Sequence, residues 1–274
     1  MSRKIQLAAE AAIPAHVEPE PLLHEVEDGV LWLTLNRPRA RNAMNHVLRG
    51  QLMSRLAVDA ADPSVRVVVI RGDARSFCAG GDIKEMGGEP AVVARKLCEG
   101  RAIVESISQL PKPVIAAVQG YASGAGFSIA LACDLIVADE TAVFQSVFVH
   151  RGLIPDLGGT YWLARQVGLF RAKQIILSGR EVSAHEARDL GLVSHLWTAD
   201  QFPAELRELA LKLASGPTVA YGLAKRLLNR TFETDMSTAL ELEALGQSVT
   251  SSSQDHRDSI EAFLAKKPAT FQGR

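Results

Sequence analysis

Short apolar segments alternate with longer amphipathic segments along the first half of the chain. Four of the short segments are rich in β-branched or other apolar residues, which predicts buried strands over 30–35, 65–70, 114–118 and 134–138. A turn at 27–29 would pair the first strand with residues 23–26. The apolar spacing over 44–59 and 90–110 predicts helices, and two prolines stop the second of these.

The second half of the chain has a different pattern. A small-residue turn over 123–126 leads into an apolar helix that ends near Ala132. Beyond about residue 158, helical spacing dominates, and only 192–197 predicts another strand. The alternation of strands and helices predicts an α/β core that is followed by a helical region. We therefore expect a loose proline-containing tail, the α/β core and a helical C-terminal region at residues 1–20, 21–200 and 201–274.

Composition and charge exclude several classes of protein. The chain has 274 residues, 47% of them hydrophobic, which is enough for one large core. A formal net charge of -1 does not fit a nucleic-acid binder, which usually carries a basic excess. No apolar stretch approaches the length of a membrane span, and prolines and acidic residues interrupt any secretory signal near the N-terminus. Three cysteines without paired spacing predict small core residues in a reducing, cytoplasmic setting.

Common nucleotide and metal motifs are incomplete. Gly124-Ala125-Gly126 begins like a dinucleotide fingerprint, but Ile129 stands where the last glycine is required. No P-loop, GxSxG or HExxH motif is present, and the seven histidines form no ligand set with suitable spacing. We therefore expect no metal site.

Two glycine-containing turns carry the strongest chemical signal. Residues 76–82 (SFCAGGD) closely follow a predicted strand, and residues 120–126 (GYASGAG) leave a strand and enter a helix. Small residues let a ligand approach the backbone, and free N–H groups at a helix N-terminus favour negative charge. Two such turns could direct two donors at one developing oxyanion. The alternative is that both are ordinary tight turns.

Several ordered segments resemble the enoyl-CoA hydratase/isomerase (crotonase) superfamily. The two turns lie in RGDARSFCAGGDIKEM (71–86) and QGYASGAGFSIALACD (119–134), which resemble its two signature segments. The similarity runs from about residue 24 to the C-terminus, through LNRPRARNAMN (35–45), RGLIPDLGGTYWLARQVG (151–168), LSGREVSAHEARDLGL (177–192) and FLAKKPATFQGR (263–274). The resemblance implies a crotonase-like spiral of ββα units, an acyl-CoA thioester substrate, and a homotrimer or a hexamer made of two trimers. It implies no cofactor apart from the coenzyme A of the substrate.

The resemblance also implies which residues form the site. The backbone N–H groups of Gly81 and Ala125 would form an oxyanion hole that holds the thioester carbonyl oxygen as it becomes an enolate. Residues implied to contact coenzyme A or the acyl group are Arg39, Ala43, Ala79, Gly81, Asp82, Ile83, Tyr121, Ala125 and Phe148.

The nucleotide end of the substrate involves the C-terminal segment in this resemblance. Phe263 and Lys267 resemble residues that reach a nucleotide bound on a neighbouring subunit. Simpler roles stay open for several of these residues. Arg39 and Lys267 could be plain surface charges. Asp82 could cap a short helix, and Tyr121 could pack in the core.

Two positions depart from the hydratase pattern. The family's hydratases carry two glutamates that position and activate water, and Ser128 and Phe148 occupy those positions here. Neither residue can act as a carboxylate base. Asp156 instead matches the aspartate of certain double-bond isomerases in the family. An apolar surrounding would raise the pKa of this carboxyl towards operating pH. The alternative is that Asp156 caps the helix predicted to follow it.

Three functions are consistent with these residues. The first is an enoyl-CoA isomerase, because a single base can remove a proton and return it two carbons away. The second is a hydratase or another crotonase lyase that uses a non-standard base. The third is an acyl-CoA-binding protein that has lost catalysis together with both glutamates. We favour the isomerase, with Asp156 as the base.

Overall fold

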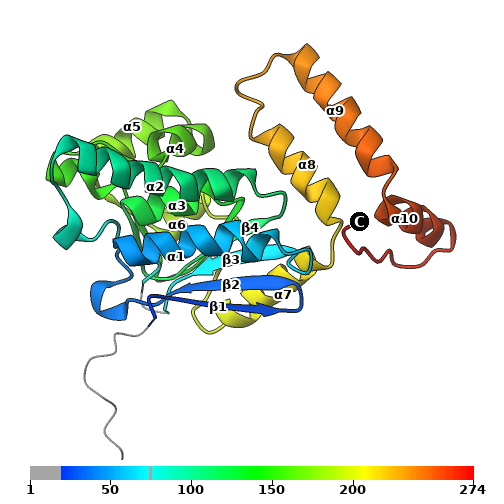
Figure 1. The fold of residues 1–274 in the computed structure, drawn as a ribbon, viewed down its shortest axis with the longest axis horizontal. Helices are drawn as coiled ribbons and strands as arrows, with labels where there is room; N and C mark the ends of the chain where they lie inside the picture. The colour runs from blue at the N-terminus through cyan, green and yellow to red at the C-terminus, as the bar shows by residue number, and fades with distance from the viewer. Residues whose placement is uncertain (1–19, 74–75) are drawn as a thin grey trace, which may run out of the picture.

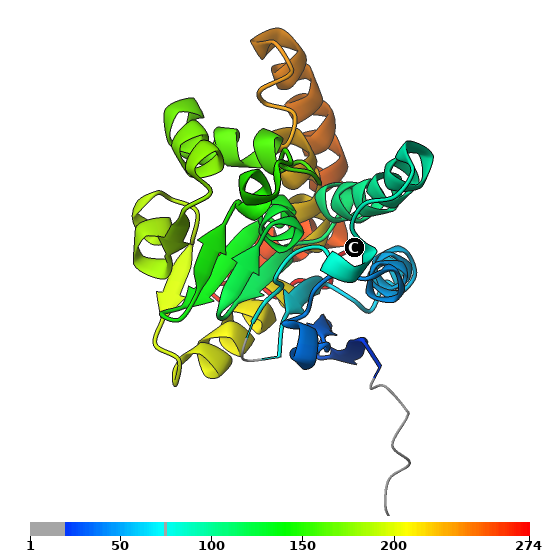
Figure 2. The same cartoon turned by 90° about the vertical axis from the view of Figure 1, so that its left-hand side faces the viewer.

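The centre of the protein is a six-stranded sheet, as the computed structural model of residues 20–73 and 76–274 shows. Its strand order is β1-β2-β3-β4-β6-β9 (Figures 1 and 2). β1 and β2 pair antiparallel, and each later pair of neighbours is parallel. Its strands are β1 (Leu22–Glu27), β2 (Val30–Leu35), β3 (Val67–Arg71), β4 (Val114–Val118), β6 (Leu135–Asp139) and β9 (His195–Trp197).

A second, smaller sheet lies beside the second glycine turn. It has the order β5-β7-β8, and its strands are β5 (Tyr121–Ser123), β7 (Val143–Gln145) and β8 (Glu181–Ser183). The sequence did not predict these strands, because three residues are too few to show an alternating pattern. Since β5 pairs with β7, the turn that precedes the apolar helix is held by a sheet.

Alternate residues of the central strands serve two separate cores. In β3, Val68 and Ile70 join the larger core, whereas Val67 and Val69 join the smaller one. Because side chains alternate across a strand, both faces of this sheet must be covered, which explains the nearly continuous apolar sequence of β3. Figure 1 shows α1, α2 and α3 over one face and α7 beneath the other.

Ten α-helices surround the sheets in the described part of the chain. They are α1 (His46–Ala57), α2 (Pro90–Gln109), α3 (Ala125–Ala132), α4 (Gly159–Val167), α5 (Leu169–Ser178), α6 (Ala184–Asp189), α7 (Phe202–Ala214), α8 (Thr218–Leu228), α9 (Met236–Ser251) and α10 (Gln254–Leu264). Short 3-10 helices occupy Pro38–Ala40, Asp59–Ala61, Ile83–Glu85 and Val147–Arg151. None of the helices described is long and apolar enough to cross a bilayer.

The last three helices project away from the sheets (Figure 1). The buried ammonium group of Lys225 in α8 ties this extension to the body, because it donates to the carbonyl of Ile107 and to the Asp134 carboxylate, each at 2.7 Å. The chain end folds back on α10, where the buried carboxylate of Asp255 accepts the N–H groups of Gln272 at 2.6 Å and Gly273 at 2.9 Å.

The fold confirms the predicted α/β class and the helical region that follows. Every strand predicted in the first half is present, and the strand predicted over 192–197 is shorter, at 195–197. The prediction that all three cysteines are buried is wrong for Cys98, which is exposed on α2. The division at residue 200 stays a prediction, although the first helix after it, α7, packs on the sheet. Residues 1–19 of the predicted tail lie outside the described residues.

Candidate active site

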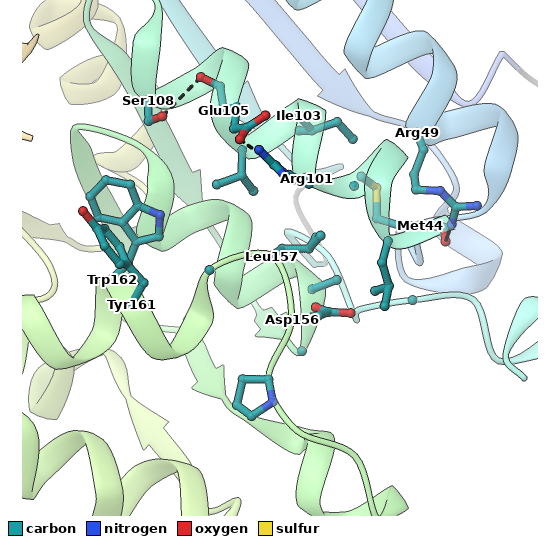
Figure 3. Close-up of a pocket in the computed structure, with 18 of the residues that line it drawn as sticks. Met44, Arg49, Arg101, Ile103, Glu105, Ser108, Asp156, Leu157, Tyr161 and Trp162 are labelled. Carbon is teal, nitrogen blue, oxygen red and sulfur yellow. Dashed lines mark hydrogen bonds and ion pairs between the residues drawn. The ribbon is translucent and has the colours of Figure 1, made fainter. Parts of the chain in front are cut away.

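A cleft of about 1970 Å³ opens between the sheet-covering helices and the C-terminal extension. Residues of α2, α4, α8 and α9 line it, together with both glycine turns and the loop before α4. Figure 3 shows Asp156 and Leu157 on that loop, and Tyr161 and Trp162 at the start of α4. The cleft exceeds the usual size of a pocket for a small ligand, roughly 300–1,000 Å³, so it has room for an elongated molecule.

Backbone hydrogen bonds join the two glycine turns. The N–H of Cys78 donates to Tyr121, and the N–H of Ser123 donates to Cys78, both at 2.9 Å. At Gly80 the approach is so close that an added Cβ would lie 3.1 Å from the Ser123 carbonyl and 3.7 Å from the Ala125 nitrogen. Gly80 also has a φ of +104°, which disfavours any other residue. The turns, far apart in sequence, therefore meet at one wall of the cleft.

Two N–H groups at this wall have no acceptor among the described residues. The N–H of Met44 donates to the carbonyl of Gly80 at 2.7 Å, and the N–H of Asp82 donates to the carbonyl of Met44 at 3.1 Å. The N–H of Gly81, which lies between these two hydrogen bonds, takes part in neither. Ala125 is the first residue of α3, where N–H groups have no partner within the helix. Neither N–H donates to any group in residues 20–73 and 76–274, and both residues line the cleft. Two donors are thus available beside the positive end of a helix dipole.

Asp156 brings a carboxylate into the same cleft. Its Oδ1 atom is buried and has no hydrogen-bond partner among the described residues. Burial raises the pKa of this carboxyl to about 6, because the loss of solvation of the charged form outweighs a backbone hydrogen bond that favours it. Figure 3 shows the carboxylate pointing into the cleft, on the side of Met44.

The helix-cap alternative for Asp156 is wrong. The residue that caps α4 is Gly158, and no side chain bonds to the first turn of this helix. Leu157 and Gly158 both have a positive φ, of 50° and 78°, and they carry the chain around a tight bend between Asp156 and the helix. The bend leaves the Asp156 side chain available to the cleft.

Comparison with known proteins identifies the family. The family model for enoyl-CoA hydratase/isomerase matches residues 25–274. The chain belongs to this family. It is 36% identical to the 1,2-epoxyphenylacetyl-CoA isomerase of Escherichia coli (strain K12), with 93% of this chain and 99% of the relative covered. It is 39% identical to the 2,3-dehydroadipyl-CoA hydratase of the same strain, with coverage of 89% and 96%.

Solved structures of this family share the fold. A putative enoyl-CoA hydratase from Streptomyces coelicolor A3(2) superposes with a TM-score of 0.89 at 35% identity, over 96% of this chain and 98% of the other. An enoyl-CoA hydratase from Bacillus anthracis gives a TM-score of 0.88 at 32% identity, over 93% and 100%. The crotonase-like fold expected from the sequence is therefore confirmed, and the protein is an acyl-CoA enzyme of the enoyl-CoA hydratase/isomerase family.

The two positions that carry glutamates in hydratases have different surroundings. Ser128 is buried in α3 and does not line the cleft. Its hydroxyl packs so closely under α4 that a Cβ added to Gly159 would lie 2.7 Å from it. Phe148 lines the cleft and packs beside Gly124. Neither position offers an acid or a base.

The residues implied to bind coenzyme A fall into two groups. Four of them line the cleft near the first turn, namely Ala43, Ala79, Asp82 and Ile83. Asp82 also caps the short helix after it, since its carboxylate accepts the N–H of Lys84 at 3.1 Å, and it forms an ion pair with Arg37 at 2.9 Å. Arg39 is exposed and lies outside the lining of the cleft.

Tyr121, Phe263 and Lys267 do not line the cleft of their own chain. Tyr121 starts β5, and its hydroxyl donates to Glu181 of β8 at 3.4 Å; its contact with the substrate stays a prediction. Phe263 lies near the C-terminal end of α10 and is exposed, and Lys267 is exposed as well. A single chain does not test their predicted reach to a neighbouring subunit.

Much of the cleft wall was missed by the sequence analysis. Several side chains of α2, α8 and α9 line it, among them Leu97, Val104, Leu227 and Leu245. Glu85 also lines it, and its carboxylate is held by His46 at 2.7 Å and Arg49 at 3.3 Å. No local signal marks these residues, because their contact with the cleft depends on how helices distant in sequence pack.

Proposed function

We propose that this protein shifts a carbon–carbon double bond in an enoyl-CoA thioester. The N–H groups of Gly81 and Ala125 would hold the carbonyl oxygen, and Asp156 would move the proton. One observation carries the proposal: within residues 20–73 and 76–274, a buried carboxylate oxygen without a partner shares a cleft with two backbone donors that lack acceptors.

The proposed reaction needs one base and one anion site. In a 3-enoyl thioester, the Asp156 carboxylate removes a proton from C2. The electron pair delocalises towards the carbonyl oxygen, which the two N–H groups stabilise. The protonated Asp156 then returns the proton to C4, so that the double bond lies between C2 and C3 and no atom is gained or lost. Donors fixed in place need no reorganisation, and removal of one such donor typically costs about 3–4 kcal/mol.

Burial of Asp156 supports this role. A carboxyl with a pKa of about 6 is still charged at neutral pH, and it binds a proton more strongly than an ordinary aspartate does. Such a group can both accept and return a proton during one turnover. The similarity to a 1,2-epoxyphenylacetyl-CoA isomerase supports an isomerase, while the relatives named as hydratases support water addition as the second candidate.

The decisive experiment measures turnover on a panel of 2-enoyl, 3-enoyl and dienoyl thioesters. Asp156→Asn should retain affinity for acyl-CoA and lose double-bond migration by orders of magnitude. The exposed Asp200→Asn serves as the matched control and should keep full activity. Unchanged migration in Asp156→Asn would remove this residue from the mechanism.

Labelled water separates the remaining candidates. Oxygen-18 in a 3-hydroxyacyl product would support a hydratase, in which case water addition needs a base other than Ser128 or Phe148. Absence of turnover on the whole panel, together with acyl-CoA binding, would support a protein that binds without catalysis.

We also propose that the protein forms a homotrimer or a hexamer made of two trimers. The extension carries large apolar side chains with high exposure in the single chain, such as Met236 at 78% and Phe263 at 82%. Covering such residues would stabilise an assembly. It would also allow Phe263 and Lys267 to approach a nucleotide on a neighbouring subunit. Light scattering after size-exclusion chromatography should give a trimer or hexamer mass, and a monomer mass would contradict the proposal.

A further inference from the structure

The backbone immediately after Asp156 is held in an unfavourable conformation. Leu157 has a φ of +50°, in the left-handed region, and Gly158 follows with a φ of +78°. The left-handed conformation costs a non-glycine residue roughly 1–2 kcal/mol. A leucine keeps such a conformation only where its surroundings stabilise it, so the contacts of this side chain reveal what fixes the bend.

The side chain of Leu157 packs against the backbone of α2 at Gly100, where no side chain covers the helix. A Cβ added to Gly100 would lie 2.5 Å from Cδ2 of Leu157, and 3.6 Å from its Cδ1 and Cγ. Gly100 is buried in the middle of α2, where glycine is about 1 kcal/mol less favourable than alanine. A strained leucine and an unfavourable helix glycine thus meet at one contact, the Gly100–Leu157 contact.

The neighbouring residues extend the same packing. Gly158 lies against Trp162 and Val104, where an added Cβ would meet ring and methyl carbons at 3.1 Å and 3.9 Å. The carbonyl of Asp156 accepts the N–H of Gly159 at 2.9 Å. In the part of the chain that the structure describes, no group donates to the buried Oδ1 atom of the Asp156 side chain. Its position is therefore set by the backbone that precedes and follows it.

We propose that Gly100 and Leu157 are positioning residues, whose contact fixes the bend after Asp156 and so aims its carboxylate at the cleft wall formed by Gly81 and Ala125. This inference rests on the proposed role of Asp156. Gly100 itself touches no reacting atom. It acts by leaving the space that Leu157 fills.

The Gly100→Ala variant tests the contact directly. The added methyl meets the tip of a flexible side chain, so Leu157 should turn out of its seat while α2 keeps its fold. A misplaced catalytic group can cost about 100-fold in rate. We therefore expect kcat to fall roughly tenfold to 100-fold with little change in KM. Gly50→Ala is the matched control, because Gly50 lies in helix α1 with nothing within 4 Å of an added Cβ, and it should keep wild-type kcat.

A readout specific to Asp156 separates positioning from general loss of structure. The 13C resonance of the Asp156 carboxyl, assigned by its absence in Asp156→Asn, should titrate near pH 6 in the wild type and at lower pH in Gly100→Ala, since a loosened loop admits water. The double variant Gly100→Ala/Leu157→Ala should be no slower than the slower single variant, because both changes remove the same contact.

The outcomes distinguish the inference from the proposed function. If Asp156→Asn abolishes migration while Gly100→Ala keeps both wild-type kcat and the wild-type carboxyl titration, the positioning role is overturned and the isomerase stands. If Asp156→Asn leaves migration unchanged, the proposed function fails. In that case the carboxyl titration still decides whether Gly100 sets the environment of Asp156.

Discussion

Replacing Asp156 with asparagine should stabilise the folded protein while it removes activity. The Asp156 residue is half-buried, and its Oδ1 atom is buried without a partner among the described residues. Burial raises the pKa of this group from 3.8 to about 6. A rise of that size means that the fold disfavours the charged carboxylate by about 3 kcal/mol relative to the unfolded chain. The asparagine side chain of the variant carries no charge, so the gain in unfolding free energy at neutral pH should approach this figure.

The effect has a defined pH dependence. Below about pH 4 the carboxyl is protonated in both folded and unfolded chains, so the variant should gain little. Between about pH 4 and pH 6 the folded protein keeps a proton that the unfolded chain releases, and wild-type stability falls as pH rises. Above about pH 6 both states are ionised, and the advantage of Asp156→Asn should reach a constant value.

Urea unfolding at a series of pH values and one fixed protein concentration measures this difference. The control is Asp200→Asn, which changes an exposed aspartate without a hydrogen-bond partner in the described structure and should change the unfolding free energy much less than Asp156→Asn does. A constant difference for Asp156→Asn across pH 4–8, or one that shrinks as pH rises, would refute the argument that burial disfavours this charge.

Three further substitutions test how the fold supports the site. Gly126→Ala should lower kcat by roughly 100-fold or more, because its methyl would overlap the carbonyl of Cys78 and separate the two proposed oxyanion donors. Steady-state kinetics measure this effect, and circular dichroism checks that the variant is folded. Lys225→Met should lower the unfolding free energy by about 1.5–3 kcal/mol, since it removes the charged donor of the partly buried Asp134 carboxylate, and adding Asp134→Asn should recover part of the loss in urea unfolding. Asp255→Asn weakens the acceptor of two N–H groups in the chain end, so limited trypsin digestion should cut the C-terminus faster than in the wild type. An unchanged rate of cleavage would contradict the role of Asp255 in holding the chain end.

The sequence was most informative where one local pattern was sufficient. The apolar residues of β2, β3 and β4 predicted buried strands, because a strand covered on both faces needs no polar alternation. The glycine turns were also visible, since glycine adopts the positive φ found at Gly80 and Gly124 more readily than any other residue. The strands of the smaller sheet were missed because each has only three residues.

Asp156 shows the limit of local reasoning about the site. Its position before a helix made a cap as natural a prediction as a base, because aspartate is a favoured N-cap. Two left-handed residues after it decided between these roles, and a leucine gives no sequence signal that it will adopt such a conformation. The partner that accommodates this leucine, Gly100, lies in a helix far away in the sequence, where a glycine would otherwise count only as a weak point.

The sequence by itself determined the α/β core, the two turns that supply free backbone donors, and the absence of carboxylates at Ser128 and Phe148, because each depends on residue type and near neighbours. Tertiary structure decided that the two turns share one wall, that the Asp156 Oδ1 atom lies in the same cleft without a partner among the described residues, and that α8 and α9 close the far side of the cleft. The reason is that burial, and with it the raised pKa of Asp156, comes from segments that meet only when the chain has folded.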